Sequence, residues 1–220
     1  MKDYQREFIT FAIKKKALEF REITLKSGRR SPYFFNSGLF NTGKDLAELG
    51  QFYAKAFIDY QPACDIIFGP AYKGIPIITT MVVTLFKHYH FDKPFCFNRK
   101  EIKKHGEGGE LIGSPLKGNV VIVDDVITAG TAIKESAEII KRHKAKLSAV
   151  ILSLNRQEKG KNNISAVQEI EKKFKCQVFS VITFNDLINF LSENSKMPDH
   201  LAKMKHYRKT YGITLPSSSY

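Results

Sequence analysis

The sequence predicts an α/β fold in which helices flank a central, mostly parallel sheet of five strands. Two observations support this prediction: short apolar runs rich in β-branched residues recur along the chain, and segments long enough for a helix separate them. Such alternation of strands and helices is typical of a parallel sheet with right-handed crossovers. The expected strands are residues 64–68, 95–97, 120–123, 149–152 and 178–182, and the expected helices between them are 75–87, 132–143 and 164–174.

The N-terminal part departs from this alternation. Amphipathic helices are expected at about residues 4–16 and 44–59. Between them, residues 21–25 and the extended segment 33–36 flank a turn with a central glycine, Lys26–Arg30. This pattern predicts a β-hairpin.

Length and composition predict one globular domain spanning residues 1–220, because 43% of the 220 residues are hydrophobic. The longest mostly apolar run, residues 75–86, is too short to span a bilayer, and the first ten residues lack the apolar stretch of a signal peptide. We therefore expect a cytoplasmic protein without a membrane partner.

The formal net charge of +13 is compatible with a nucleic-acid binder, a membrane-surface protein or an enzyme with a polyanionic substrate. Much of the excess lies in lysine clusters on the expected helices, where solvated faces are the simpler explanation. Cations on glycine-containing loops are more informative, because loops carry ligand sites. These are Lys26, Lys73, Arg99, Lys100, Lys103 and Lys104.

The most informative segment is residues 120–132, VVIVDDVITAGTA. Its apolar run suits a strand buried on both faces, which places Asp124 and Asp125 at the carboxyl end, where open α/β sheets bind ligands. The following turn supplies backbone N–H groups and the hydroxyls of Thr128 and Thr131 at the start of a helix, a favourable position for an anion.

An acid pair beside a phosphate site indicates a sugar phosphate. Carboxylates repel phosphate oxygens but accept hydrogen bonds from vicinal hydroxyls, so the pattern predicts a ribose 5-phosphate with its phosphate in the turn and its hydroxyls on the acids. The simpler alternative is a solvated acid pair followed by an ordinary turn.

Two further loops carry cations. Residues 68–74, FGPAYKG, follow an expected strand and precede a helix, so Lys73 and the backbone can face a second anion, although a plain turn would use Gly and Pro equally well. Residues 99–113 are polar and contain closely spaced glycines. They predict a mobile cationic lid suited to a diphosphate, or a surface loop without a function.

The segment 120–132 resembles the phosphoribosyl-diphosphate-binding motif of the type I phosphoribosyltransferases. Residues 25–43, 68–76 and 97–113 are similar to orotate phosphoribosyltransferases at matching spacing. The resemblance implies the family fold with a hood, formed mainly by residues 1–40 plus C-terminal elements. It also implies transfer of phosphoribose from 5-phospho-α-D-ribose 1-diphosphate (PRPP) to orotate, with Mg²⁺ held mainly by substrate and water.

The resemblance assigns residues to each part of the reaction. The catalytic residues it implies are Lys73, Arg99, Lys103, Asp124 and Asp125. The residues it implies for PRPP are Lys26, Tyr72, Lys73, Arg99, Lys100, Lys103, His105, Asp124, Asp125, Val126, Ile127, Thr128, Ala129, Gly130, Thr131 and Ala132. Those it implies for orotate are Lys26, Phe34, Phe35, Thr128 and Arg156.

The resemblance also implies a strained, often cis, peptide in the loop 68–74, which we place at Ala71–Tyr72. It implies that the lid closes over the active site of the neighbouring subunit, so that a homodimer is required for activity. Residues 213–220 are expected to form an unmatched tail.

Two other functions remain open at this point. A phosphoribosyltransferase for another base would keep the motif and differ in the hood and at Arg156, and assays with purine bases would distinguish it. A non-catalytic regulator on the same fold would use the basic surface for RNA or DNA. The lid and the second cationic loop argue against that, so we expect no nucleic-acid partner.

Overall fold

The computed structural model describes residues 1–25, 27–103, 109–128, 130–160, 163–194 and 197–213, with only the backbone for residues 102 and 103. The elements in chain order are α1 (Asp3–Lys14), β1 (Leu18–Glu19), β2 (Ile23–Thr24), β3 (Arg30–Ser31), β4 (Phe34–Phe35), η1 (Ser37–Leu39), α2 (Gly43–Tyr60), β5 (Ile66–Gly69), α3 (Gly74–Tyr89), β6 (Phe95–Lys103), β7 (Gly109–Gly113), β8 (Asn119–Val126), α4 (Thr131–Arg142), β9 (Lys146–Asn155), α5 (Ala166–Phe174), β10 (Gln177–Thr183), α6 (Phe184–Glu193) and α7 (Pro198–Tyr211).

The central sheet confirms the predicted α/β class, with one more strand than expected. Its order is β10-β9-β8-β5-β6-β7. All neighbours pair in parallel except β7, which runs antiparallel to β6. The expected count of five strands is therefore wrong. The apolar part of β7 is only Leu111 and Ile112, between two glycines, so the pairing with β6 and not a local pattern shows that it is a strand.

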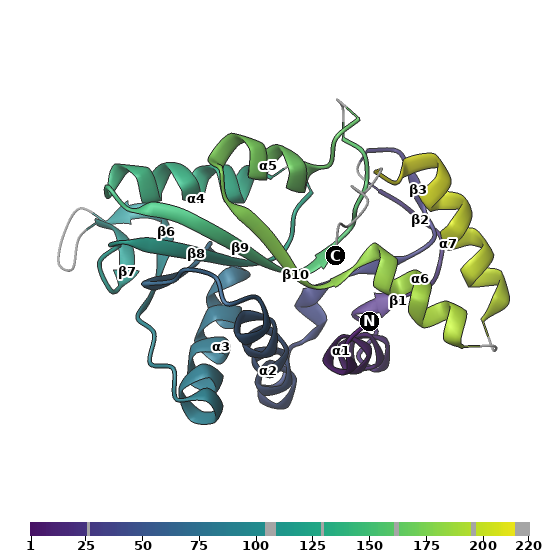
Figure 1. Ribbon diagram of the computed structural model, residues 1–220, viewed down its shortest axis with the longest axis horizontal. Helices are drawn as coiled ribbons and strands as arrows, with labels where there is room; N and C mark the ends of the chain where they lie inside the picture. Colours follow the sequence, from purple (N-terminus) through teal and green to yellow (C-terminus); the bar gives the residue numbers. More distant parts are fainter. Residues whose placement is uncertain (26, 104–108, 129, 161–162, 195–196, 214–220) are drawn as a thin grey trace.

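Helices cover both faces of the sheet (Figure 1): α4 and α5 lie on one face, and α2 and α3 on the other. The buried strand β8 contains an uninterrupted apolar run, residues 120–123, because it is covered on both faces. Val121 and Val123 contribute to the core on the α2 and α3 side, whereas Val120 and Ile122 contribute to the core on the α4 and α5 side. Period-two alternation between two buried faces makes each of residues 120–123 apolar.

The N-terminal region forms two short antiparallel pairs instead of the single predicted hairpin. β2 pairs with β3 around the expected turn, and β4 pairs with β1. The turn prediction is thus confirmed, but the pairing of Phe34 and Phe35 with residues 21–25 is wrong. Their partners, Leu18 and Glu19, precede the expected segment, and two-residue strands leave little pattern to read.

The C-terminal helices α6 and α7 lie beside α1 and the short N-terminal strands (Figure 1). Phe184 of α6 packs its ring 5.3 Å from that of Tyr33 and 6.0 Å from that of Tyr207 in α7. N- and C-terminal segments therefore share one aromatic core. No helix in the described part of the chain is long and apolar enough to cross a membrane.

The strand order positions a ligand site. After β5 the chain crosses through α3 to β6 on one side, whereas β8 lies on the other side of β5. The chain directions diverge between β5 and β8, and ligands of open α/β sheets bind at the carboxyl ends of strands at such a point. The segments after β5 and β8 are the two predicted anion loops.

Candidate active site

Two buried carboxylates mark the carboxyl end of β8. Asp124 is 8% exposed and Asp125 is 6% exposed. One oxygen of each accepts a hydrogen bond from the next backbone N–H: Asp124 Oδ1 from Asp125 at 2.9 Å, and Asp125 Oδ1 from Val126 at 2.7 Å. These local bonds orient both side chains at the ligand-binding edge of the sheet.

The second oxygen of Asp125 joins three parts of the chain. Oδ2 lies 2.7 Å from the Nζ of Lys73, at the start of α3, and accepts a 2.7 Å hydrogen bond from the hydroxyl of Ser37. Ser37 belongs to η1, directly after the N-terminal strand β4. Asp125 is therefore the point at which the N-terminal region, the loop after β5 and the end of β8 meet.

Asp124 has a different environment from its neighbour. Burial, followed by the adjacent charge of Asp125, raises the pKa of Asp124 to about 7. Its backbone carbonyl accepts a 2.8 Å hydrogen bond from the hydroxyl of Tyr53, which also lies 2.6 Å from the hydroxyl of Ser153. Tyr53 thus holds the backbone of the acid pair against α2 and β9.

The turn after the acid pair leads directly into α4. Gly130 is the N-cap residue and has a φ of 72°, a left-handed conformation that glycine adopts without strain. Thr128 and Thr131 are exposed, Ile127 is buried and Ala132 is half-buried, whereas Ala129 lies outside the described residues. The exposed start of α4 can accommodate an anion, as the sequence predicts.

The loop after β5 has the predicted cis peptide at Ala71–Tyr72. The glycines at its two ends approach closely: a Cβ on Gly69 would lie 2.7 Å from the carbonyl oxygen of Gly74. The amide of Ala71 donates a 2.8 Å hydrogen bond to Asn98 Oδ1 of β6. Tyr72 is 72% exposed, so this loop presents its surface to solvent.

The expected lid lies partly in regular structure. Residues 99–103 continue β6 and 109–113 form β7, so the two ends of the expected lid are paired strands. The Nε of Arg99 is buried without a hydrogen-bond partner among the described residues. The Nζ of Lys100 lies 3.8 Å from Glu135 of α4. The side chain of Lys103, all of Lys104 and all of His105 lie outside the described residues.

The residues expected around the base lie on adjoining elements. Phe34 and Phe35 form β4, with Phe35 buried. Arg156 directly follows β9, the parallel neighbour of β8, so both strands bring their carboxyl ends to one edge. The guanidinium of Arg156 pairs with Glu158 and lies 4.6 Å above the ring of Tyr33. Lys26 lies outside the described residues.

The structure thus brings Lys73 and Asp125 into contact and places the turn and Arg156 at the same edge. The amine of Lys100 pairs with Glu135, and its charge also acts on Asp124, where it opposes the rise in pKa. Sequence reasoning missed the partners Ser37, Tyr53, Asn98 and Glu158. Ser37 and Asn98 lie within the similar segments 25–43 and 97–113, but no role was assigned to any of the four, because each acts through a contact made only in the folded chain.

In the part of the chain that the structure describes, no group of three or more His, Cys, Asp or Glu side chains comes together in a way that could hold a metal ion. The acid pair supplies carboxylates at the ligand edge. This donor set fits a magnesium ion that takes its other ligands from substrate oxygens and water.

Comparison with known proteins agrees with this architecture. Residues 39–182 match the phosphoribosyl transferase domain family. The chain is 64% identical over 213 residues to orotate phosphoribosyltransferases of Photorhabdus laumondii and Proteus mirabilis, covering 97% of this chain and 100% of each relative. The crystal structure of orotate phosphoribosyltransferase from Francisella tularensis superposes with a TM-score of 0.86 at 44% identity, over 94% of this chain and 99% of that one. The chain belongs to the orotate phosphoribosyltransferase family.

Proposed function

We propose that the enzyme transfers the 5-phosphoribosyl group from PRPP to orotate, giving orotidine 5′-phosphate and diphosphate in pyrimidine (UMP) biosynthesis. The observation that carries this proposal is the convergence on Asp125 of Ser37 from the N-terminal region and Lys73 from the loop after β5. The relatives that match over their full length are orotate phosphoribosyltransferases.

PRPP binds across the point between β5 and β8. The 5′-phosphate occupies the turn 127–132 at the start of α4, where N–H groups and hydroxyls gather. Asp124 and Asp125 accept hydrogen bonds from the ribose hydroxyls. Their charge also favours the positive character that the ribose ring gains as the bond to diphosphate lengthens.

The diphosphate leaves from C1′ towards the loop 70–73 and the end of β6. Lys73 and Arg99, with Lys103, meet the negative charge that grows on the leaving oxygen. Bound Mg²⁺ supplies further neutralisation of that charge. No protein nucleophile is required, because a ring nitrogen of orotate forms the new bond to C1′ on the face opposite the leaving group.

Orotate occupies the space between the N-terminal strands and the end of β9. Backbone groups of Phe34 and Phe35 with Lys26 and Thr128 hold the ring. Arg156 pairs with the carboxylate of orotate, for which a planar guanidinium is well suited. The position of Arg156 directly after β9 supports this assignment, because Asp124 pairs with Leu152 of the same strand.

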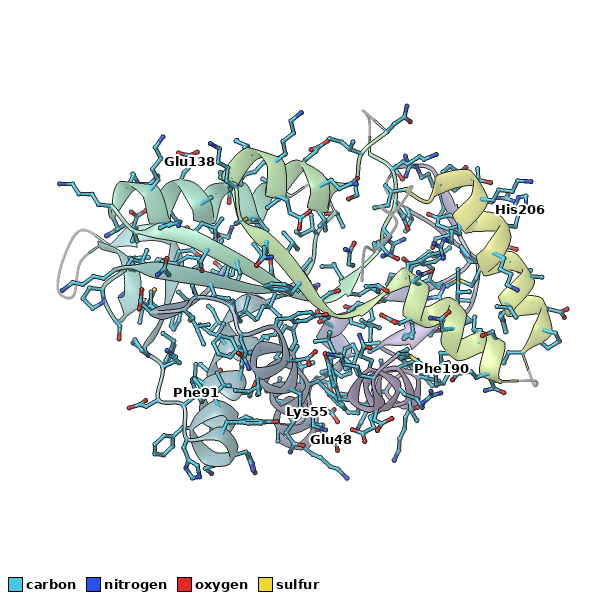
Figure 2. All side chains as sticks on the ribbon, in the orientation of Figure 1. Glu48, Lys55, Phe91, Glu138, Phe190 and His206 are labelled. Atoms are coloured by element: carbon cyan, nitrogen blue, oxygen red, sulfur yellow. The ribbon has the colours of Figure 1, made fainter. Side chains whose placement is uncertain are left out.

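The active enzyme is a homodimer in which the lid serves the neighbouring site. β6 and β7 lie at the opposite end of the molecule from α6 and α7 (Figure 1). Three large apolar side chains around the end of α3 are exposed: Val83, Phe86 and Phe91, at 51%, 59% and 45%. Figure 2 shows Phe91 at the outer edge of the helical layer. Such a patch is suited to a subunit interface. A cytoplasmic location stays a prediction from the sequence.

The assay that tests the function follows the loss of orotate absorbance. We expect a decrease that requires both PRPP and Mg²⁺ and that stops when either is omitted. In parallel reactions, adenine, hypoxanthine or uracil is supplied in place of orotate, and the diphosphate released is measured. Turnover of a purine base in place of orotate would overturn the base assignment while leaving the PRPP site standing.

A further inference from the structure

Arg156 is held along one edge by a carboxylate two residues further along the chain. A single oxygen of Glu158, Oε1, accepts hydrogen bonds from Nε at 3.0 Å and from Nη2 at 2.7 Å. Both side chains are 14% exposed. The backbone of Glu158 is held by a β-bridge with Gly212, the residue that caps the C-terminal end of α7.

One face of the guanidinium is fixed as well. It lies 4.6 Å from the ring centre of Tyr33, whose hydroxyl lies 3.4 Å from the same oxygen of Glu158. Burial alone would lower the pKa of Arg156, but Tyr33 and Glu158 beside it raise that pKa above its ordinary value. Arg156 therefore stays charged and keeps one orientation.

The contact with Glu158 leaves a defined part of the guanidinium for another acceptor. A guanidinium presents two forks of parallel N–H groups: a side-on fork from Nε and Nη2, and an end-on fork from Nη1 and Nη2. Glu158 takes the side-on fork. On the end-on fork, Nη2 has a long contact, 3.5 Å to the hydroxyl of Ser31, which a carboxylate can replace. The end-on fork has the geometry that pairs with a carboxylate through two parallel hydrogen bonds.

We propose that Glu158 is a positioning residue for orotate, acting through Arg156. It holds the side-on fork so that the end-on fork alone meets the orotate carboxylate. This proposal rests on the function proposed above, in which Arg156 pairs with that carboxylate.

The opposite role would make Glu158 a competitor that orotate displaces. That role requires the substrate to separate a largely buried ion pair and leave Glu158 without its partner, which is strongly unfavourable. End-on pairing requires no such separation. The geometry thus favours a carboxylate that stays in place during turnover.

The buried hydroxyl of Tyr207 lies in the same cluster. Tyr207 is 4% exposed, and its hydroxyl lies beside both Glu158 and Arg156 without a hydrogen bond of good geometry to any described residue. Burial, followed by the charge of Glu158, raises the pKa of Tyr207 to about 12. The low exposure of Tyr207, Glu158 and Arg156 limits solvent screening of the contact between Glu158 and Arg156.

The test compares two substitutions at one position. Glu158→Ala frees the side-on fork and should raise the KM for orotate about tenfold or more, while the KM for PRPP changes less than about twofold. Glu158→Gln keeps an acceptor oxygen in place and should bring the KM for orotate back to within about threefold of the wild-type value. Glu22→Ala is the matched control, because Glu22 pairs with Lys203 at 3.2 Å on the exposed surface.

A double substitution tests whether Glu158 acts through Arg156. If it does, Glu158→Ala combined with Arg156→Ala should have the same KM for orotate as Arg156→Ala alone. Titration calorimetry with orotidine 5′-phosphate should show the same order of the variants in Kd, and thermal unfolding should show that each variant is folded.

An unchanged or lower KM for orotate in Glu158→Ala, or additive effects in the double variant, would overturn the proposal. If Arg156→Ala itself left that KM unchanged, the base assignment would fail as well, which separates the two claims.

Discussion

Lys73 and Asp125 form an ion pair across the two anion loops, with 2.7 Å between Nζ and Oδ2. The lysine side chain is 55% exposed, whereas the carboxylate is 8% exposed. The partly solvated cation can therefore turn towards an arriving diphosphate, while Ser37 still donates to the buried carboxylate. Before substrate binds, the pair reduces the repulsion between two adjacent buried acids.

Asp125→Asn should reduce kcat by about a hundredfold, because the charge beside the ribose is lost while the shape is kept. Thermal unfolding should show a folded protein with a modestly lower Tm, because the amide has one acceptor oxygen where the carboxylate uses two. Asp199→Asn, on the exposed first turn of α7, is the control and should keep the wild-type rate. Full activity of Asp125→Asn at saturating substrate would refute the assignment of the ribose to this acid.

The raised pKa of Asp124 predicts that the free energy of unfolding depends on pH. Its pKa rises from an ordinary value of 3.8 to about 7 in the fold, mainly through burial. Between these values the native protein binds the proton more tightly than the unfolded chain does, so the free energy of unfolding falls as pH rises towards 7. Asp124→Asn removes this loss and retains an acceptor for the amide of Asp125.

Thermal unfolding at two pH values checks this effect. We expect the Tm of Asp124→Asn to exceed that of the wild type by about 3 °C or more near pH 8, and the difference to shrink near pH 4. The kcat of the variant should fall, though less than that of Asp125→Asn. An equal Tm difference at both pH values would show that titration of Asp124 does not cause it.

The sequence predicted the elements whose signal is local. β8 is buried on both faces, so its apolar run and the two acids that follow the run could be identified from the sequence alone. Likewise, α2 begins at Gly43, close to the expected start at about residue 44, and its N-cap Thr42 accepts a hydrogen bond from the backbone of Asp45. By contrast, β7 and the pairs made by β1 to β4 depend on partners elsewhere in the chain, and no local pattern specifies them.

The same division holds in the site. Asp124, Asp125 and the turn form one continuous motif, so residue types and spacing predicted their chemistry. Ser37 lies 88 residues from Asp125, and Tyr53 lies 71 residues from Asp124. A serine or a buried tyrosine has many uses in a fold, so only the folded contacts show that these two hold the acid pair.

Mixing two inactive variants tests the shared active site. Lys103→Ala should reduce kcat by about a hundredfold or more and leave the dimer folded. If the lid serves the partner, a heterodimer of Lys103→Ala and Asp125→Asn subunits contains one site with both residues intact and one with both altered. Activity should return on mixing and refolding. A verified heterodimer that shows only the sum of the parental rates would mean that the lid acts on its own subunit.

The most direct test of the account is the response of each KM to Arg156→Ala. Only orotate carries the carboxylate assigned to this arginine, so its KM should rise by about tenfold or more while the KM for PRPP changes little. Arg6→Ala, which removes an exposed pair with Glu193, should change neither value. An equal rise in both KM values, or an unchanged KM for orotate, would contradict the placement of the base at the end of β9.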